Sequence, residues 1–251
     1  MSRPRKRHVQ QELVFKRHGG KRKGAGRKSK RARPGSAHKE RPVLKSRFPV
    51  HVVLRVARDV GSLRKRLMYK ALREATLAVA RRELDFAEEG FLRIVHISIQ
   101  RTHVHLLVEA QHRTALSRGM QSFQISAAKH INGVISMRRG ERRRGSVFPD
   151  RFHQTIITNA RQARRALAYV MNNWRKHGED RLRHAEGWKL DPFATGMYFD
   201  GWKERAGDPL MWKLRDTYER MLVYIPRTWL LTTGWRQYGS ISVLELPSKP
   251  I

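Results

Sequence analysis

The elements that the sequence predicts occur in the order strand, helix, strand, strand, helix, strand, helix, which indicates an α+β fold of the ferredoxin-like (RRM-like) kind with one extra helix. Four segments alternate apolar and polar residues in the way that is typical of strands. Three others repeat apolar residues every three or four positions, as helices do. We therefore expect an antiparallel sheet with helices on one face, together with a tyrosine-bearing helix and a C-terminal extension.

The first half of this order lies between residues 48 and 110. A strand is expected from Phe48, where the run PVHVVLRV is rich in β-branched residues. Apolar residues then recur at helical spacing from Ser62 to about Leu84, with no Gly or Pro to interrupt them. Two strand-like runs follow, FLRIVHISIQ and HVHLLVEA, and only two polar residues separate them. This spacing predicts that the two runs pair as a hairpin.

The second half predicts a helix over 114–137, a strand in VFPDRFHQTIIT over 147–158, and a third helix over 160–176. Beyond residue 178 the chain is punctuated by Trp and Pro. There the pattern indicates a short helix near 211–224 and a strand-like end near 241–246. No chemical role follows from the pattern of this extension.

The composition divides the chain into three regions, 1–47, 48–178 and 179–251. The first region holds 18 Lys or Arg against two Glu, with Gly-rich stretches, and we expect it to be a disordered basic arm. Such an arm neutralises phosphates without reading bases, so it adds affinity and salt sensitivity more than specificity. A solubilising or charge-balancing tail is the alternative. The predicted sheet and helices occupy 48–178.

The charge of the chain predicts a polyanionic partner. Lys and Arg total 54 against 21 Asp and Glu, a formal net charge of +33. Nucleic acid is favoured over a membrane surface, because the sequence has no apolar run of about 18 residues and no signal-peptide core. The absence of Cys excludes disulfides and thiolate metal sites, and permits a reducing compartment. We expect a cytoplasmic, nucleoid-associated protein.

His103 and His105 form the sharpest local signal. A strand has a side-chain period of two, so both imidazoles project from one face and can share a metal ion. Taken alone the motif is weak, because the chain has 12 His and this spacing also arises by chance. Glu109 lies on the same strand face as a possible further ligand, although a surface carboxylate is the favoured interpretation. Other strand histidines, for which no spacing forces convergence, are expected to be structural or DNA-contacting: His51, His96 and His153.

Tyr169 and Asn173 form the second signal, because a spacing of four residues stacks the phenol and the amide on one helix face. A phenol has a pKa of about 10, so a metal-polarised phosphate and nearby cations would be needed to make it an effective nucleophile. Without the His pair, packing at the edge of an amphipathic helix is the simpler interpretation. Cations surround the pair on this helix and could either contact phosphates or form an ordinary solvated face: Arg161, Arg164, Arg165, Arg175 and Lys176.

The remaining motifs narrow the choice of chemistry. The chain has no Walker-type phosphate loop, no His-Glu-X-X-His helix and no Gly-X-Ser-X-Gly elbow, so nucleotide hydrolysis and protease or esterase chemistry lose their usual support. C-terminal tryptophans could stack unpaired bases, although packing is the favoured role. These residues are Trp188, Trp202, Trp212, Trp229 and Trp235.

The strand HVHLLVE, the helix AYVMNN and the element order together resemble the REP-associated tyrosine transposase branch of the single-tyrosine HUH-superfamily (insertion-sequence-like) transposases, over residues 48–178. The resemblance implies that His103 and His105 bind Mg²⁺ or Mn²⁺ and that Tyr169 attacks DNA. It also implies that Asn173 is the third ligand, since this branch has Asn where insertion-sequence members often carry Gln. The chain departs from the branch in having Asn172-Asn173-Trp174-Arg175 where the branch usually has an Asn-Pro-Val-Arg run.

The function that the resemblance implies is that of a metal-dependent single-stranded DNA endonuclease and strand transferase, a transposase acting through a 5′-phosphotyrosine intermediate on single-stranded or hairpin DNA. The alternatives are a catalytically idle nucleic-acid-binding protein of the same fold and, less similar to this chain, a replication-initiator or conjugative nuclease. The target hairpin, the metal, use of Tyr169 within one subunit or across a dimer, and a monomer or homodimer all stay open. DNA contacts are expected from the helix cations named above and from the connector residues Arg138, Arg139, Arg142, Arg143 and Arg144.

Overall fold

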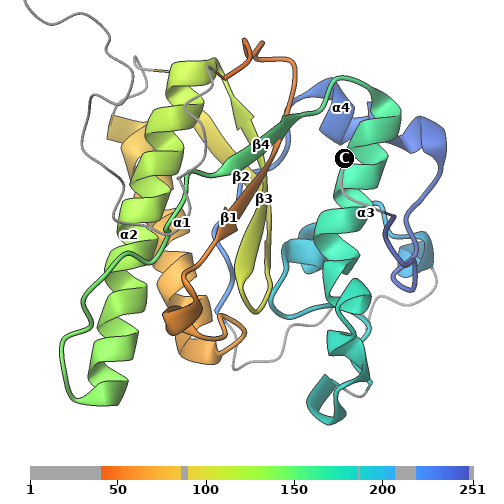
Figure 1. Ribbon diagram of the computed structural model, residues 1–251. Helices are drawn as coiled ribbons and strands as arrows, with labels where there is room; N and C mark the ends of the chain where they lie inside the picture. The colour runs from red at the N-terminus through yellow and green to blue at the C-terminus, as the bar shows by residue number, and fades with distance from the viewer. Residues whose placement is uncertain (1–40, 86–89, 186, 207–218, 249–251) are drawn as a thin grey trace, which may run out of the picture. The chain divides into compact units, whose positions relative to one another are not determined.

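Four antiparallel strands form one sheet in the order β2-β3-β1-β4, the strand order of the ferredoxin-like fold (Figure 1). The computed structural model describes residues 41–85, 90–185, 187–206 and 219–248, all of which belong to one unit, His38–Ile251. The strands are β1 (Val50–Arg55), β2 (Leu92–Ile99), β3 (His103–Ala110) and β4 (His153–Ile156). The helices are α1 (Arg66–Asp85), α2 (Arg113–Arg139), α3 (Ala160–Lys176) and the short α4 (Trp229–Thr232).

Two hydrophobic layers sandwich the sheet. On β3 the even-numbered residues, such as Val104 and Leu106, face α1 and α2 and join Phe123 in one core. The odd-numbered Leu107 faces the other way and packs with Leu167 of α3 in a second core. Figure 1 shows α1 and α2 on one side of the sheet and α3 on the other. The alternation of β3 therefore separates a purely structural face from the face that carries the His pair.

A bulge in β2 changes which side chains face each layer. The register with β3 shifts between Ile94 and His96, so Ile94 and Ile97 both face the α1–α2 core although three positions separate them. The extra residue leaves Val95 in the core beneath α3. Strict alternation along FLRIVHISIQ does not predict this arrangement, because a bulge adds one residue to a single strand.

Several predicted boundaries were wrong by a few residues. Helix α1 begins at Arg66 rather than Ser62, because the preceding loop is fastened to the β2–β3 hairpin: the Leu63 N–H donates to the Arg101 carbonyl at 2.9 Å. Strand β4 is limited to His153–Ile156 of the predicted range 147–158, since the Val147 carbonyl instead accepts a hydrogen bond from the Ala57 N–H in a loop. Helix α2 is slightly longer than predicted, and α3 has the predicted bounds.

The C-terminal extension packs on α3 and along β2. The strand-like end at 241–246 is not a strand, since Ile241 makes only an isolated parallel bridge to Trp202. Of the helix expected at 211–224, residues 211–218 lie outside the described residues, and the remainder is irregular and follows β2, with the Tyr224 N–H donating to the Ile94 carbonyl at 2.8 Å. The short 3-10 turns are Arg58–Val60, Glu179–Arg181, Arg183–Ala185, Thr195–Tyr198, Lys203–Ala206 and Gly234–Tyr238.

Residues 1–40 of the expected basic arm, 1–47, lie outside the described residues. Its last seven residues contact the folded unit: Leu44 is buried in the α1–α2 core, and the Arg41 guanidinium lies over the Phe152 ring. Among the described residues, no helix has the length and apolar character needed to span a membrane.

Candidate active site

The sheet face beneath α3 brings together His103 and His105, the two histidines that the sequence singled out. Both occupy odd-numbered positions of β3, and their ring centroids lie 4.7 Å apart. His105 is buried and His103 is half-buried. The period of the strand thus places the two rings next to each other on the face that α3 covers.

Helix α3 delivers Tyr169 to the same place. The Asn159 side chain caps the helix by accepting the Gln162 N–H at 2.9 Å, and Gly178, at φ 67°, follows its end. Only 7% of Tyr169 is exposed, and its ring packs edge-on against His105 with the centroids 5.2 Å apart. The phenol and the His pair therefore meet within a single chain.

Asn173 lies one helical turn after Tyr169 and is fully buried. Its amide nitrogen and oxygen both lack a hydrogen-bond partner, as does Nε2 of His105. Buried polar atoms without partners are rare in folded proteins, and a bound ligand, water or ion is one explanation for them. An imidazole nitrogen and an amide oxygen are suitable donors for a divalent cation. Within the described ranges no three His, Cys, Asp or Glu side chains are grouped to hold a metal, so a site here depends on the amide as a donor.

His51 is part of this cluster, although nothing in the sequence spacing predicted that it would meet the His pair, and a structural or DNA-contacting role was expected. It projects from β1, and its Nε2 lies 3.1 Å from Nδ1 of His105. The ring stacks on His105 at 5.2 Å and meets Tyr169 edge-on at 5.8 Å. Its position in the strand was the one indication in the sequence. Successive side chains of a strand face opposite sides of the sheet, so His51, between the core residues Val50 and Val52, must face the His-pair side.

Burial keeps these imidazoles neutral. It lowers the pKa of His103 to about 4, with further lowering by His177 and Arg55. It also lowers the pKa of His105 well below 6.5, assisted by His51 and His103. A neutral imidazole retains the lone pair that a metal requires, so both residues are in the state suited to binding one.

Burial shifts the pKa of the Tyr169 phenol upward, whereas it shifts the pKa of the imidazoles downward. Burial raises the pKa of Tyr169 above 10, so the hydroxyl is protonated at neutral pH. The Lys176 Nζ lies 5.0 Å from the centre of the Tyr169 ring. His177, the residue after α3, extends the cluster toward solvent and lies 5.6 Å from the His103 ring. These positively charged and polar groups border the side of the site that solvent reaches.

Glu109 corrects an expectation, since it is neither at the surface nor near the site. Its carboxylate is fully buried, pairs with Arg93, and accepts the backbone N–H groups of Arg227 and Thr228 at 2.9 and 2.7 Å. Four residues along the strand from His105, it fastens the C-terminal extension to β3. It is therefore a structural residue rather than a further ligand.

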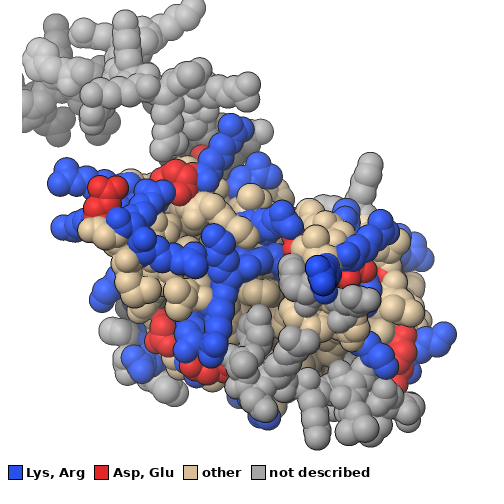
Figure 2. Space-filling view, turned by 90° about the horizontal axis from the view of Figure 1, so that it is seen from below, with Lys and Arg blue, Asp and Glu red and all other residues tan. Residues whose placement is uncertain are grey.

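The basic residues predicted to contact DNA fall into two groups. Three of the cations form contacts within the protein: Arg143 with Asp59, Arg164 with Glu245, and Arg175 with Asp180. The C-terminal ends of α2 and α3 point toward the lower edge of Figure 1, and Figure 2 shows Lys and Arg gathered in a band across this face. The exposed members of the predicted set are Arg138, Arg139, Arg142, Arg144, Arg161, Arg165 and Lys176.

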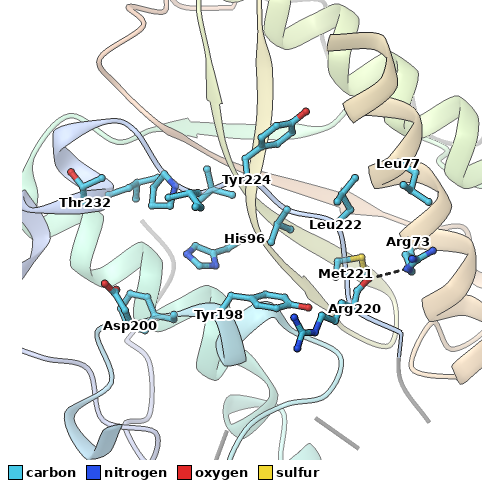
Figure 3. A pocket seen from close by; sticks show the side chains of 16 residues that line it. Arg73, Leu77, His96, Tyr198, Asp200, Arg220, Met221, Leu222, Tyr224 and Thr232 are labelled. Carbon is cyan, nitrogen blue, oxygen red and sulfur yellow. Dashed lines mark hydrogen bonds between the residues drawn. The ribbon is translucent and has the colours of Figure 1, made fainter. Parts of the chain in front are cut away.

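His96 lies away from the His pair, whereas His153 shares its sheet face, since Val53 pairs with both His105 and His153. His96, on β2, faces a separate cavity of about 620 Å³, where Figure 3 shows it between Tyr198 and Tyr224. Its Nδ1 lies 3.2 Å from the Thr195 hydroxyl, and burial lowers its pKa to about 4. His153 is exposed on the edge strand β4. Of the two roles that the sequence allowed, structural or DNA-contacting, the burial of His96 favours the structural one.

The tryptophans of the extension are mainly packing residues, as expected. Trp202 and Trp235 are buried in the core beneath α3, and Trp188 is half-buried. Trp229 is the exception, with 54% of its surface exposed. Trp212 lies outside the described residues.

Comparison with known proteins agrees with the sequence pattern. A family model described as "Transposase IS200 like" matches residues 45–173, about half of the chain and a range that contains His103, His105, Tyr169 and Asn173. No curated protein matches the chain. A solved structure described as a "REP associates tyrosine transposase bound to a REP hairpin" is similar at 17% identity and a TM-score of 0.46, covering 74% of this chain and 99% of that one. By its match to the family model, the chain belongs to the IS200-like transposase family.

Proposed function

We propose that the protein is a metal-dependent single-stranded DNA endonuclease and strand transferase with the Tyr169 hydroxyl as its nucleophile. The observation that carries the proposal is the packing of Tyr169 against His105, together with the buried atoms of His105 and of Asn173, one helical turn after Tyr169, that have no partner. Membership in the IS200-like family supports the same chemistry. All of these groups belong to one chain, which favours use of Tyr169 within its own subunit.

The proposed metal ligands are His103, His105 and Asn173. Two imidazole nitrogens and one amide oxygen leave coordination positions open for a phosphate and water, and Mg²⁺ or Mn²⁺ is the expected ion. When bound, the ion would stabilise negative charge on the non-bridging oxygens of the scissile phosphate. The neutral state of both imidazoles supports this assignment.

The reaction that these residues support is a transesterification. The Tyr169 oxygen attacks the phosphorus, the bond from phosphorus to the 3′ oxygen breaks, and the phenolic proton is transferred to the departing 3′ oxygen, which becomes a free hydroxyl. The product is a 5′-phosphotyrosine link, in which one new phosphoester bond, to the Tyr169 oxygen, replaces the one that was broken. The 3′-hydroxyl of a second strand can then reverse the attack and rejoin the DNA. No nucleotide hydrolysis is needed.

Lys176 is placed to assist this step. Its ammonium group lies 5.0 Å from the centre of the Tyr169 ring, so it stabilises negative charge that develops on the phenol oxygen as the proton leaves. This matters because burial raises the pKa of Tyr169 and disfavours the phenolate. Lys176 is exposed, and it can also contact the phosphate that approaches the nucleophile.

The proposed DNA path follows the exposed basic residues at the C-terminal ends of α2 and α3 (Figure 2). Contacts to phosphates position a strand without reading its sequence. A folded hairpin as the substrate is inferred from the resemblance of the sequence to REP-associated tyrosine transposases. The connector after α2, which includes Arg142 and Arg144, is the expected contact for such a stem.

The decisive experiment incubates the purified protein with Mn²⁺ or Mg²⁺ and single-stranded oligonucleotides that span both flanks of its own gene. The expected product is a protein–DNA adduct that resists denaturant. Tyr169→Phe should abolish the adduct while preserving DNA affinity, because it removes only the attacking oxygen. His103→Ala should also abolish the adduct and spare much of the binding.

Two controls make the result interpretable. A chelator should prevent the adduct in the wild-type protein, and His96→Gln, which changes a histidine that faces a separate cavity, should leave it intact. Salt-sensitive binding with no adduct on any flank, strand or metal would instead indicate the catalytically idle DNA-binding protein. An adduct that persists in Tyr169→Phe would assign the nucleophile to another residue.

A further inference from the structure

His51 and His105 form a hydrogen bond between two buried imidazoles. Val53 lies directly opposite His105 in the β1–β3 ladder, so His51 is the diagonal neighbour of His105 on the same sheet face. Long side chains can span such a diagonal. Nε2 of His51 lies 3.1 Å from Nδ1 of His105, and only 3% of each residue is exposed. The two rings therefore fix each other's position away from water.

The hydrogen bond constrains where the proton of His105 can lie. A neutral imidazole carries one N–H and one lone pair, so a metal-binding nitrogen leaves the other nitrogen as a donor. Nε2 of His105 has no partner within the protein, whereas its Nδ1 faces His51. If Nδ1 of His105 donates to Nε2 of His51, the lone pair of His105 lies on Nε2. With the opposite polarity, the proton would lie on Nε2 and no lone pair would be available there.

We infer that His51 is a positioning residue that holds His105 in the Nδ1–H form, with the lone pair of Nε2 directed toward the metal. The inference rests on the proposed function, because it assigns His51 a task only in a metal site. The partner nitrogen of a metal-binding histidine commonly donates to a carboxylate, a carbonyl or water, and loss of that partner weakens metal binding about 10- to 100-fold. In this protein a second imidazole takes that place.

The surroundings of His51 favour this role over simple packing. Its neighbours Val50 and Val52 face the hydrophobic core under α1 and α2, whereas His51 faces His105 and Tyr169. An apolar side chain at this position would fill the same space without leaving polar atoms to satisfy. The stacking on His105, with 20° between the ring planes, also fixes the rotation of the His105 ring.

The test compares His51→Gln, whose amide oxygen can accept the Nδ1–H of His105, with His51→Leu, which fills the space but accepts nothing. His96→Gln is the matched control, since His96 is also buried on a strand but faces a different cavity. The proton position of His105 is read from proton–nitrogen correlation spectra of the metal-free protein. Affinity for Mn²⁺ is measured by titration, and thermal unfolding without metal reports any loss of folding.

We expect His105 to be in the Nδ1–H form in the wild type, in His51→Gln and in His96→Gln, and to change to the Nε2–H form in His51→Leu. Affinity for Mn²⁺ should fall about 10- to 100-fold in His51→Leu and by less than about threefold in His51→Gln. A purely structural role would lower the unfolding temperature of both variants and leave the Mn²⁺ affinity unchanged.

The outcomes separate this inference from the proposed function. An Nε2–H form in the wild type, or equal Mn²⁺ affinity in the wild type and His51→Leu, overturns the role of His51 and leaves the Tyr169 adduct test untouched. If the wild type binds no Mn²⁺ and His105→Ala behaves like it, the metal site of the proposed function fails, and the inference fails with it.

Discussion

The Glu109 carboxylate accepts the backbone N–H of Thr228 at 2.7 Å, although 119 positions separate the two residues in the sequence. Glu109 belongs to β3, which also carries His103 and His105. Thr228 precedes α4 in the C-terminal extension. This contact ties the extension to the strand at the centre of the candidate site, and it offers a direct test of what the extension contributes to stability.

Replacing Glu109 by Ala should lower the free energy of unfolding by about 3 kcal/mol, because it leaves the buried guanidinium of Arg93 without its partner and two backbone N–H groups without an acceptor. Denaturant unfolding measures the loss, and hydrogen exchange should show faster exchange at Thr228. Glu245→Ala, which removes a partly exposed ion pair with Arg164, should cost less than about 1 kcal/mol. Equal losses in the two variants would contradict this account.

Removal of the cation beside the nucleophile should slow cleavage. Lys176→Gln is expected to reduce the rate of adduct formation at neutral pH about two- to fivefold, which corresponds to roughly 0.5–1 kcal/mol for an exposed charge near the developing phenolate. Single-turnover kinetics at saturating DNA measure the rate. Arg161→Gln is the matched control, because Arg161 is an exposed cation on the same helix that lies over Tyr238 instead. A rate equally reduced by both substitutions would indicate a general charge effect.

The connector after α2 offers a contrast between a DNA-contacting and a structural arginine. Arg142 and Arg144 are exposed, so replacing both by Gln should weaken single-stranded DNA binding and reduce the slope of log affinity against log salt by about 0.7 for each lost phosphate contact. Binding titrations across a range of salt concentrations measure the slope. An unchanged slope would place the DNA elsewhere on the protein.

Arg143, between them, should behave differently. Its buried guanidinium pairs with Asp59 and donates to Asn132 at 2.6 Å and to the Gly145 carbonyl at 3.2 Å. Arg143→Gln should therefore lower the free energy of unfolding by about 2 kcal/mol and leave the salt slope unchanged. A reduced slope with normal stability would reverse the assignment.

Buried His96 makes stability depend on pH. Burial lowers the pKa of His96 to about 4 in the folded state, and the unfolded chain has the ordinary value of about 6.5. Between these values the unfolded state binds a proton that the folded state does not, so the contribution is complete above pH 6.5 and is lost as the pH falls toward 4. The expected loss from this residue is roughly 3 kcal/mol. Asp200, at the rim of the same cavity, opposes the effect (Figure 3).

This prediction is checked by denaturant unfolding of the wild type and His96→Gln between pH 7 and pH 4. The wild type should lose more stability than the variant over this interval, and the difference isolates His96 from the other buried histidines. Parallel curves for the two proteins would show that His96 keeps its ordinary pKa in the fold.

Local periodicity was sufficient to predict the main catalytic candidates. The period of two along β3 placed His103 and His105 on one sheet face, and the spacing of four along α3 placed Tyr169 and Asn173 on one helix face. The bounds of α3 were also predicted correctly, because its apolar stripe runs without interruption between the cap residue Asn159 and Gly178. Each of these features depends on residues within a few positions of one another.

The sequence by itself determined which side chains share a strand face or a helix face, and with them the family. Only the tertiary structure decided that α3 covers the His-pair side of the sheet, that His51 meets His105 across the β1–β3 pairing, and that Glu109 is buried by a segment 119 positions away. The physical reason is that backbone geometry sets the direction of neighbouring side chains locally. Contacts between distant segments depend instead on strand order and on which apolar surfaces pack together, and no local spacing records either.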